Sequence, residues 1–236
     1  MYETLGRYYD IFTADVKYDE WCDFAVGFFD GTRGADVGCG SGGFTSRLAL
    51  RGYSVIGVDG SPEMIAAANK NAAKLGLKTV YAVQDCEKLS CGQNLDFVTA
   101  VCDVVNYLKS PGKFFVRVRK CLKKGGVFVF DVSSRYKIEN ILANNVFSDE
   151  KDGVLYVWSN TLGKNKIDMF LTFFEKGEDG KYVRADEEQT QYIYDARDLA
   201  DELVKAGFDD VKIYDGYKNK KATDDSERLV FVAEAK

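Results

Sequence analysis

The stretch Gly34-Ala35-Asp36-Val37-Gly38-Cys39-Gly40-Ser41-Gly42-Gly43 decides the fold. Its apolar start predicts a short strand, and its glycines predict a tight loop that leads into a helix over 44–50. Gly38 and Gly40 have no Cβ, so they can take a positive φ and let a ligand approach the backbone. The amide end of the helix would face that ligand. The stretch therefore predicts a site for a nucleotide-like ligand.

The glycine spacing fits two signatures at once. The first, G-x-G-x-x-G, is typical of dinucleotide-binding domains and is matched by Gly38, Gly40 and Gly43. The second, D-x-G-x-G-x-G, is typical of class I S-adenosylmethionine-dependent methyltransferases and is matched by Asp36, Gly38, Gly40 and Gly42. A strand-to-helix turn without any ligand is a third interpretation. The glycines alone do not choose, so the rest of the chain must decide.

Length and composition predict one soluble domain. A chain of 236 residues with 46% hydrophobic residues can bury a sizeable core without disulfides. It has no run of ~18 apolar residues, and its start, residues 1–7, lacks the basic-then-apolar pattern of a secretion signal. We therefore expect a cytoplasmic protein that does not contact a membrane.

Charge and residue usage exclude two further classes of site. The six cysteines are scattered without C-x-x-C spacing and the chain has no histidine, which predicts reduced buried thiols and no metal. The net charge of -5 argues against long nucleic acids as partners, because such binding rests on Lys and Arg that neutralise phosphates.

Residues 1–30 predict an N-terminal cover. Apolar side chains recur at helical spacing between residues 15 and 30. This helix either packs on the core, or it brings Tyr9, Tyr18 and Trp21 over a ligand pocket as a lid.

Acidic residues follow two of the next predicted strands. Asp59 ends the run over 53–59, nineteen residues beyond Gly40, where a carboxylate can accept hydrogen bonds from both ribose hydroxyls of an adenosine. Asp85 follows the strand over 79–83 and can accept from the adenine amine, while the Cys86 amide can donate to the ring. Taken alone, Asp85 would be interpreted as a helix cap.

The alternation of strands and helices predicts a doubly wound, Rossmann-like, mostly parallel seven-stranded sheet, with its ligand at the carboxyl ends of the strands. After residue 133 the pattern changes to aromatic-rich runs, which predict an inserted three-stranded antiparallel sheet. The last two strands are too close for a helical crossover, so we expect an antiparallel edge hairpin. The predicted organisation is one domain over 1–236, with a cofactor-binding core over 31–133 and 195–236 and the inserted sheet over 134–194.

In motif order and spacing the chain resembles the class I S-adenosylmethionine-dependent methyltransferases, and more closely their small bacterial members with an inserted antiparallel sheet. The resemblance covers nearly the whole chain. Its motifs are the glycine loop, Val58-Asp59 with Ser61-Pro62-Glu63-Met64, Gln84-Asp85-Cys86, the stretch 95–108, and Lys123 to Asp131.

The resemblance implies S-adenosylmethionine as cofactor and assigns roles to residues. Glycines 38 and 40 would face its methionine part, Cys102 would lie near the same part, and Asp59 would hold the ribose. The adenine would meet Met64, Asp85 and the Cys86 amide. The aromatic residues Tyr9, Tyr18 and Trp21 would close over the cofactor. Asn106-Tyr107 departs from the Asn-Pro-Pro-Tyr motif of enzymes that methylate amino groups of nucleic acids.

Methyl transfer is an in-line displacement that needs neither a metal nor a covalent enzyme intermediate. A general base is needed only when the acceptor must lose a proton, and Asp103 and Tyr107 are the candidates in a chain without histidine. Both residues also have an ordinary interpretation as loop anchors. Tyr156 and Trp158, which alternate on one predicted strand, suggest a covered pocket for a small-molecule acceptor.

Two other functions fit parts of the sequence. An NAD-dependent oxidoreductase would use the same glycines and Asp59, but its Y-x-x-x-K matches, Tyr214 with Lys218 and Tyr217 with Lys221, fall between the last strands. A non-catalytic cofactor-binding or assembly module would use the inserted sheet as its interface, and that sheet could also form a homodimer.

Overall fold

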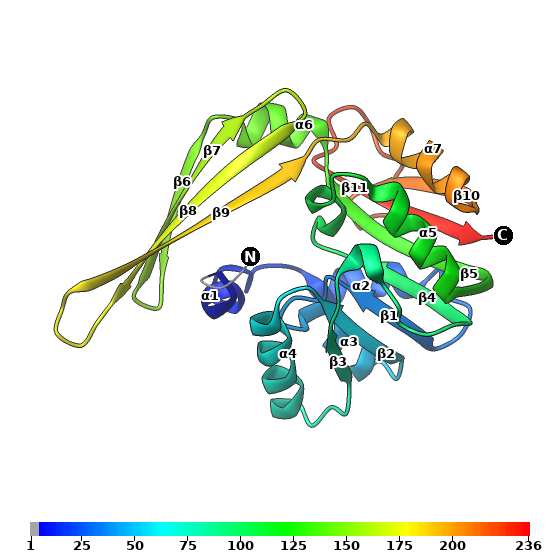
Figure 1. Cartoon of the computed structure of the whole chain (residues 1–236), viewed down its shortest axis with the longest axis horizontal. Coiled ribbons are helices and arrows are strands. Elements are labelled where there is room, and N and C mark those ends of the chain that lie inside the picture. Colours follow the sequence, from blue (N-terminus) through cyan, green and yellow to red (C-terminus); the bar gives the residue numbers. More distant parts are fainter. Residues whose placement is uncertain (1–4) are drawn as a thin grey trace.

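The computed structural model describes residues 5–236, so the first four residues of the predicted N-terminal cover lie outside the described part. A seven-stranded sheet forms the core, in the order β10-β11-β5-β4-β1-β2-β3 (Figure 1). The strands are β1 (Arg33–Val37), β2 (Ser54–Asp59), β3 (Val80–Val83), β4 (Leu95–Ala100), β5 (Leu122–Ser133), β10 (Phe208–Asp215) and β11 (Arg228–Ala235).

The pairing of the core strands confirms the predicted fold class. Strands β1 to β5 pair in parallel, whereas β11 pairs antiparallel with both β5 and β10. This antiparallel edge is the hairpin that the short final connection predicted.

Helices cover both faces of the core sheet. On one face lie α2 (Tyr18–Val26) and α3 (Gly43–Leu50), and on the other α5 (Pro111–Cys121) and α7 (Ala196–Ala206). The helix α4 (Pro62–Lys74) packs against β2 and β3. Local sequence explains their ends: the Ser61 hydroxyl accepts the Met64 amide at the start of α4, and Gly207, with φ 98°, ends α7.

Phenylalanines from β5 hold the centre of the core. The rings of Phe128 and Phe130 stack with centroids 4.8 Å apart, and Phe130 stacks on Phe231 of β11 at 4.7 Å. All three side chains are fully buried. These rings cover one face of β5, and Val127 and Val129 on the other face pack in the cluster that contains α2 and α3 residues, so both faces are covered and the strand reads as an apolar run.

The second sheet has four strands, one more than predicted. Its strands are β6 (Val146–Lys151), β7 (Val154–Leu162), β8 (Lys166–Lys176) and β9 (Tyr182–Tyr192), joined in sequence order by antiparallel pairing. The extra strand is β6, which pairs Phe147 opposite Trp158. Most of β6 is polar because one side of it is exposed, so hydrophobicity alone gave no signal for it.

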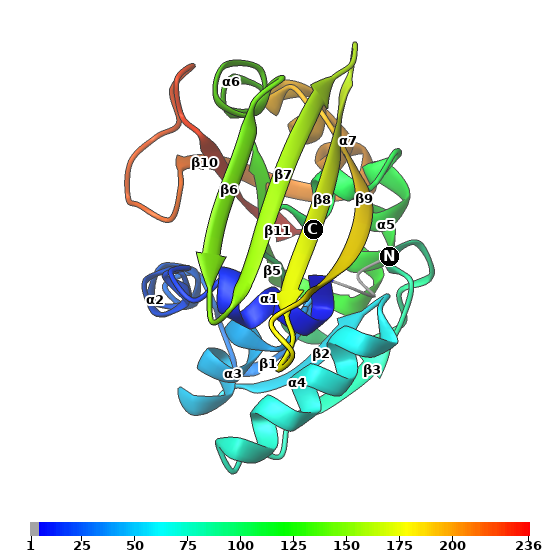
Figure 2. The same ribbon diagram turned by 90° about the vertical axis from the view of Figure 1, so that its left-hand side faces the viewer.

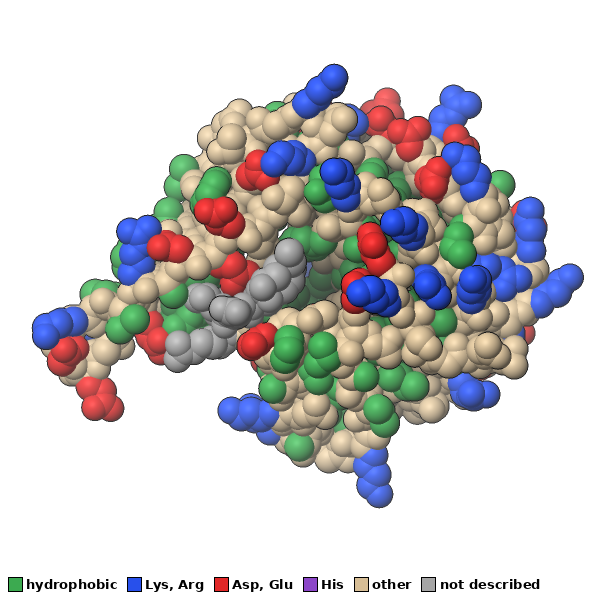
Figure 3. Space-filling view, in the orientation of Figure 1, with side chains coloured by type: hydrophobic (Ala, Val, Ile, Leu, Met, Phe, Trp, Pro, Cys, Tyr) green, Lys and Arg blue, Asp and Glu red, His purple; other side chains and the backbone are tan. Residues whose placement is uncertain are grey.

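Two short segments attach the four-stranded sheet to the core. The segments α6 (Arg135–Lys137) and η3 (Ile138–Leu142) follow β5, and Ile138 and Leu142 pack on Ile167 and Met169 of β8. The sheet extends from the core as a curved arm (Figures 1 and 2). Space-filling representation shows a hollow between this arm and the core, with hydrophobic side chains visible inside (Figure 3).

The helix α1 (Leu5–Phe12) lies beneath the arm (Figure 2). The ring of Phe12 meets that of Tyr156 edge-on at 4.5 Å, and Tyr8 donates a hydrogen bond to Glu175 at 2.5 Å. The N-terminal segment therefore joins the four-stranded sheet to the glycine loop, against which α1 also lies through Asp10 and Ser41.

Candidate functional site

A cavity of about 670 Å³ lies at the carboxyl ends of the parallel strands, where the fold places ligands. Its wall contains nine of the residues predicted from the sequence as site residues. Those residues are Tyr9, Gly38, Gly40, Asp59, Met64, Asp85, Cys86, Cys102 and Tyr107. We call this space the cofactor cavity.

The glycine loop forms the floor of the cofactor cavity with its backbone. Gly38 and Gly40 have φ values of 68° and 53°, a region that residues with side chains rarely adopt. A Cβ on Gly38 would come within 2.4 Å of Val104, so this position excludes a side chain on steric grounds as well. The amides of Gly38 and Cys39 both donate to the Val58 carbonyl, which holds the loop against β2.

Asp59 lies at the end of β2 and orders the loop around it. Its carboxylate accepts the amide of Gly40 at 2.9 Å and the amide of Ser61 at 2.9 Å. Burial raises the pKa of Asp59, and the hydrogen bonds from Ser61 and Gly40 partly offset that rise. A carboxylate has about four lone-pair sites, so Asp59 retains capacity for two further donors, such as ribose hydroxyls.

The far end of the cofactor cavity suits an adenine ring. Met64 is 2% exposed and supplies an apolar surface. Asp85 accepts the Glu87 amide and caps the short η1 helix (Cys86–Lys88), and it also lines the cavity. Both interpretations of Asp85, the cap and the ligand-facing acid, are therefore compatible with its position.

The three aromatic residues of the predicted cover occupy different places. Tyr9 lies over the glycine loop, with its ring 3.5 Å from the point where a Gly40 Cβ would stand. Tyr18 and Trp21 are not in the cavity wall. Tyr18 lies against Gly43 and its hydroxyl is 3.7 Å from Cys102 Sγ, while Trp21 stacks on Tyr217 at 4.4 Å. Their helix packs on the core.

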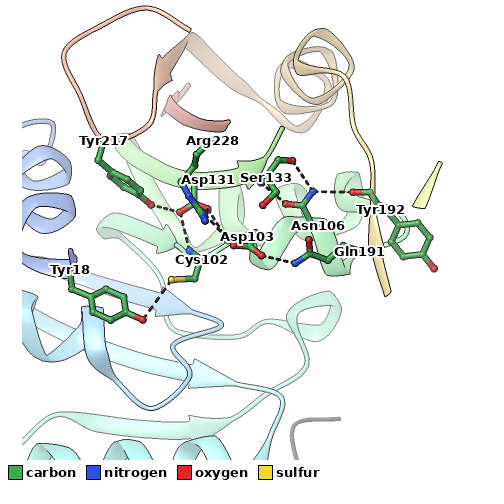
Figure 4. A network of polar contacts seen from close by, with 10 residues as sticks. All are labelled: Tyr18, Cys102, Asp103, Asn106, Asp131, Ser133, Gln191, Tyr192, Tyr217 and Arg228. Carbon is green, nitrogen blue, oxygen red and sulfur yellow. Dashed lines mark hydrogen bonds and ion pairs between the residues drawn. The ribbon is translucent and has the colours of Figure 1, made fainter. Parts of the chain in front are cut away.

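Cys102 and Asp103 form a strained turn at the end of β4. Both have positive φ, 63° and 54°, which costs on the order of 1–3 kcal/mol for each residue. The turn aims both amides at the buried carboxylate of Asp131, at 2.9 Å and 2.7 Å. Asp131 also accepts from Tyr217 and Arg228, so five residues form one polar cluster (Figure 4).

Side chains of the same region reach across to the four-stranded sheet. Asp103 accepts from Arg228 at 3.2 Å and from Gln191 of β9 at 2.5 Å (Figure 4). Tyr107 donates to Gln189, also of β9, at 2.9 Å. The two predicted catalytic residues therefore connect the core to the sheet.

A second cavity of about 230 Å³ lies beyond the first, and Tyr107 belongs to the walls of both. We call it the inner cavity. The four-stranded sheet and η3 supply its apolar wall, from Leu142, Trp158, Met169 and Leu171. Its polar wall comes from Asp103, Lys137, Gln189 and Gln191.

Sequence reasoning missed most of the polar residues of this region. Asp131 could have been found, because a single acidic residue near the end of an apolar strand needs hydrogen-bonding partners. From the sequence we interpreted it only as part of the predicted strand. Arg228, Tyr217 and Gln191 carried no such signal, because only the folded chain brings residues so distant in sequence to the end of β4.

Taken together, these features define a domain of the class I methyltransferase type: a parallel sheet, a glycine loop without side chains, and an acid at the end of the second strand. The glycine floor, the Asp59 carboxylate and the Met64 surface fit an adenosine-containing cofactor.

Comparison with known proteins agrees with this assignment to the methyltransferases. A family model described as a methyltransferase domain matches residues 35–130. A Geobacillus protein whose name assigns it provisionally to the methyltransferases is 33% identical, with 98% of both chains covered. The crystal structure of an S-adenosylmethionine-dependent methyltransferase from Clostridium acetobutylicum superposes with a TM-score of 0.87 at 32% identity, covering 97% of this chain and 96% of that one. The chain belongs to the S-adenosylmethionine-dependent methyltransferases.

Family membership settles two questions that the glycine loop left open. The cofactor is S-adenosylmethionine and the protein is a methyltransferase, which leaves the oxidoreductase and the non-catalytic module without support. Among residues 5–236, no helix combines the length and apolar character that crossing a membrane requires, and no group of metal-ligating side chains is found.

Proposed function

We propose that this enzyme methylates a small molecule held in the inner cavity. The observation that carries the proposal is the position of that cavity: it adjoins the cofactor cavity at Tyr107 and is lined by residues of β7, β8 and β9. A volume of about 230 Å³ admits a metabolite, whereas a polymer would require an open groove.

Within this proposal the residues of the cofactor cavity keep their expected roles. Gly38, Gly40 and Cys102 hold the methionine part, Asp59 holds the ribose, and Met64, Asp85 and Cys86 hold the adenine. Tyr9 covers the cofactor from α1. Tyr18 and Trp21 act indirectly, because they support the Cys102 turn and the Arg228 side chain.

The cofactor supplies an activated methyl group on a sulfonium. A lone pair of the acceptor forms the new bond to carbon, the carbon–sulfur bond breaks, and the acceptor releases a proton where it carries one. The protein contributes chiefly by orientation, which can supply as much as ~7–11 kcal/mol of a barrier.

In this proposal Asp103 receives or orients the acceptor proton; its position in the wall of the inner cavity, together with Tyr107, supports this role. Its carboxylate already accepts hydrogen bonds from Arg228 and Gln191, so we propose an acceptor that is nucleophilic when neutral, such as an amine, and that needs little help from a base. The Tyr107 hydroxyl donates its hydrogen to Gln189, so we assign Tyr107 to the wall of the two cavities and not to the role of general base. If Asp103→Asn leaves the maximal rate unchanged at every pH, Asp103 has no role as a base.

The names of proteins with this fold are consistent with small acceptors. A sugar N-methyltransferase from Streptoalloteichus superposes with a TM-score of 0.80 at 19% identity. Ubiquinone biosynthesis O-methyltransferases match about 45% of this chain at 32% identity. The nature of the methylated atom differs between them, and an amine is our choice for this chain.

Two measurements test the proposal. Thermal unfolding with S-adenosylmethionine, S-adenosylhomocysteine or NADH should show stabilisation by the two sulfur nucleosides alone, by about 2.7 kcal/mol at 100 times the dissociation constant. Mass spectrometry should then detect one added methyl group in a member of a metabolite extract. Methylation of protein or nucleic acid in place of a metabolite would refute the proposal. A cytoplasmic location and a homodimer through the four-stranded sheet stay predictions.

A further inference from the structure

Lys137 is a partly buried cation in the wall of the inner cavity. It lies at the end of α6, where the Ser134 hydroxyl accepts its backbone amide and fixes its position. Burial is the main cause of the lowered pKa of its ammonium group, and the nearby Arg228 adds to the effect. Such a placement is costly for a lysine unless an anion completes it.

Among residues 5–236, no carboxylate forms an ion pair with the Lys137 ammonium. Within residues 5–236, no carboxylate oxygen lies within 4.0 Å of it, although Lys and Arg residues elsewhere form many such pairs. The carboxylates that act on the Lys137 ammonium through longer-range electrostatic attraction are those of Asp103, Glu227 and Asp131. Asp103 and Asp131 already accept from Arg228, and Glu227 is exposed.

A second donor in the same wall also has no partner. The indole N–H of Trp158 is buried and meets no hydrogen-bond acceptor in the described part of the chain. Of the acceptor groups in the wall, the Asp103 carboxylate accepts from two residues and the Gln189 side-chain carbonyl accepts from Tyr107. The inner cavity therefore offers two donors, the Lys137 ammonium and the Trp158 indole N–H, that no acceptor in residues 5–236 uses, and its ligand should bring acceptor atoms.

The nearby carboxylates are already paired with another cation, which explains why they do not neutralise Lys137. Arg228 and Lys137 balance Asp103 and Asp131, but Arg228 contacts both carboxylates and Lys137 contacts neither. An oxyanion beside Lys137 would be held by a charge-assisted hydrogen bond and would leave the Arg228 cluster unchanged.

We propose that the methyl acceptor carries an oxyanion, a carboxylate or a phosphate, which Lys137 binds, with the Trp158 indole N–H as a second donor. The rest of the acceptor lies against Met169 and Leu171, and its nucleophilic atom faces Asp103 and Tyr107. This inference rests on the proposed small-molecule function and names the chemical class of its substrate.

The test is binding of matched probes to the enzyme loaded with S-adenosylhomocysteine. The probes are 4-aminobenzoate, 4-aminophenyl phosphate and the neutral 4-aminobenzamide, measured by calorimetry. We expect at least one anion to bind ~10-fold or more tightly than the amide, in line with hydrogen bonds to charged groups. Lys137→Met should remove this preference, whereas Lys164→Met, at an exposed turn lysine, should retain it.

The results separate this inference from the proposed function. Equal binding of the anions and the amide, failure of both anions to bind, or an undiminished preference in Lys137→Met overturns the role of Lys137. If a metabolite without an oxyanion is nevertheless methylated, the inference fails while the small-molecule function stands. Unchanged affinity of Lys137→Met for S-adenosylhomocysteine shows that the variant is folded and that the effect belongs to the inner cavity. Preference for the carboxylate or for the phosphate decides which oxyanion the site takes.

Discussion

The cofactor cavity and the inner cavity share one residue, Tyr107, but they are built differently. The cofactor cavity is made by strand ends and their loops, with the Gly38 and Gly40 backbone as its floor. The inner cavity is made mainly by side chains from the four-stranded sheet, α6 and η3, with Asp103, Tyr107 and Ser133 from the core. A ligand shared by a large family can be held by backbone geometry, whereas a particular acceptor requires particular side chains. The comparison predicts which substitutions affect each cavity.

The largest effect is expected in the polar cluster that links Cys102 of the cofactor cavity to Asp103 of the inner cavity. Arg228→Met would leave Asp131 buried without its cation, and breaking such a pair costs about 3–4 kcal/mol of unfolding free energy. Chemical denaturation measures the loss. Adding Asp131→Asn should restore part of it, because the uncompensated charge is removed. If the double variant is less stable than Arg228→Met, the pair is not the source of the effect.

A pH-dependent effect is expected beneath the glycine loop. Burial raises the pKa of Asp36 to about 6, despite hydrogen bonds from Thr45 and Thr99. The folded state then retains this proton where the unfolded state releases it. The stabilisation is complete below about pH 4 and is lost as pH rises through about 6. Relative to Asp36→Asn, the protein should lose about 2–3 kcal/mol between those limits in urea unfolding at several pH values. Parallel pH profiles for the two proteins would contradict this.

Gly38→Ala should damage the cofactor cavity alone. The new Cβ would approach Val104 within 2.4 Å and force the loop to move, so affinity for S-adenosylhomocysteine should fall at least ~10-fold. Gly52→Ala is the matched control, because Gly52 also has a positive φ, 87°, but open space around it. Calorimetric titration compares the two. If both variants lost the same affinity for S-adenosylhomocysteine, the effect would come from backbone strain in general and not from the contact with Val104.

The smallest effect is expected at the shared wall. Tyr107→Phe keeps the ring but loses the hydrogen bond to Gln189, worth about 1 kcal/mol. The KM for the acceptor should rise ~5-fold, while the dissociation constant for S-adenosylmethionine changes little. Steady-state kinetics and titration check the two values. A larger change in cofactor affinity than in KM would mean that Tyr107 belongs chiefly to the cofactor cavity.

The sequence predicted the cofactor cavity better than the inner cavity, for a physical reason. Asp59 and Asp85 each follow a strand directly, so their meeting at one edge follows from parallel pairing. Gln191 contacts Asp103 only after β9 takes its register, and Lys137 reaches the wall of the same cavity only in the folded chain, so no local pattern encodes this arrangement. Trp21 shows the limit in the other direction: its helical spacing was equally compatible with a lid and with the core face on which it lies.

The pleat of the four-stranded sheet has a further consequence for how such enzymes diversify. Its contributions to the inner cavity alternate along the strands, as Met169 with Leu171 and Gln189 with Gln191, while the intervening Phe170 is 41% exposed. Inward positions can thus be exchanged without altering the outer surface, and neither exchange touches the glycine loop. Substrate choice in this architecture can drift at a few alternate positions while the methyl donor stays fixed, which makes the inner face of the sheet the place to begin redesigning the enzyme for a new acceptor.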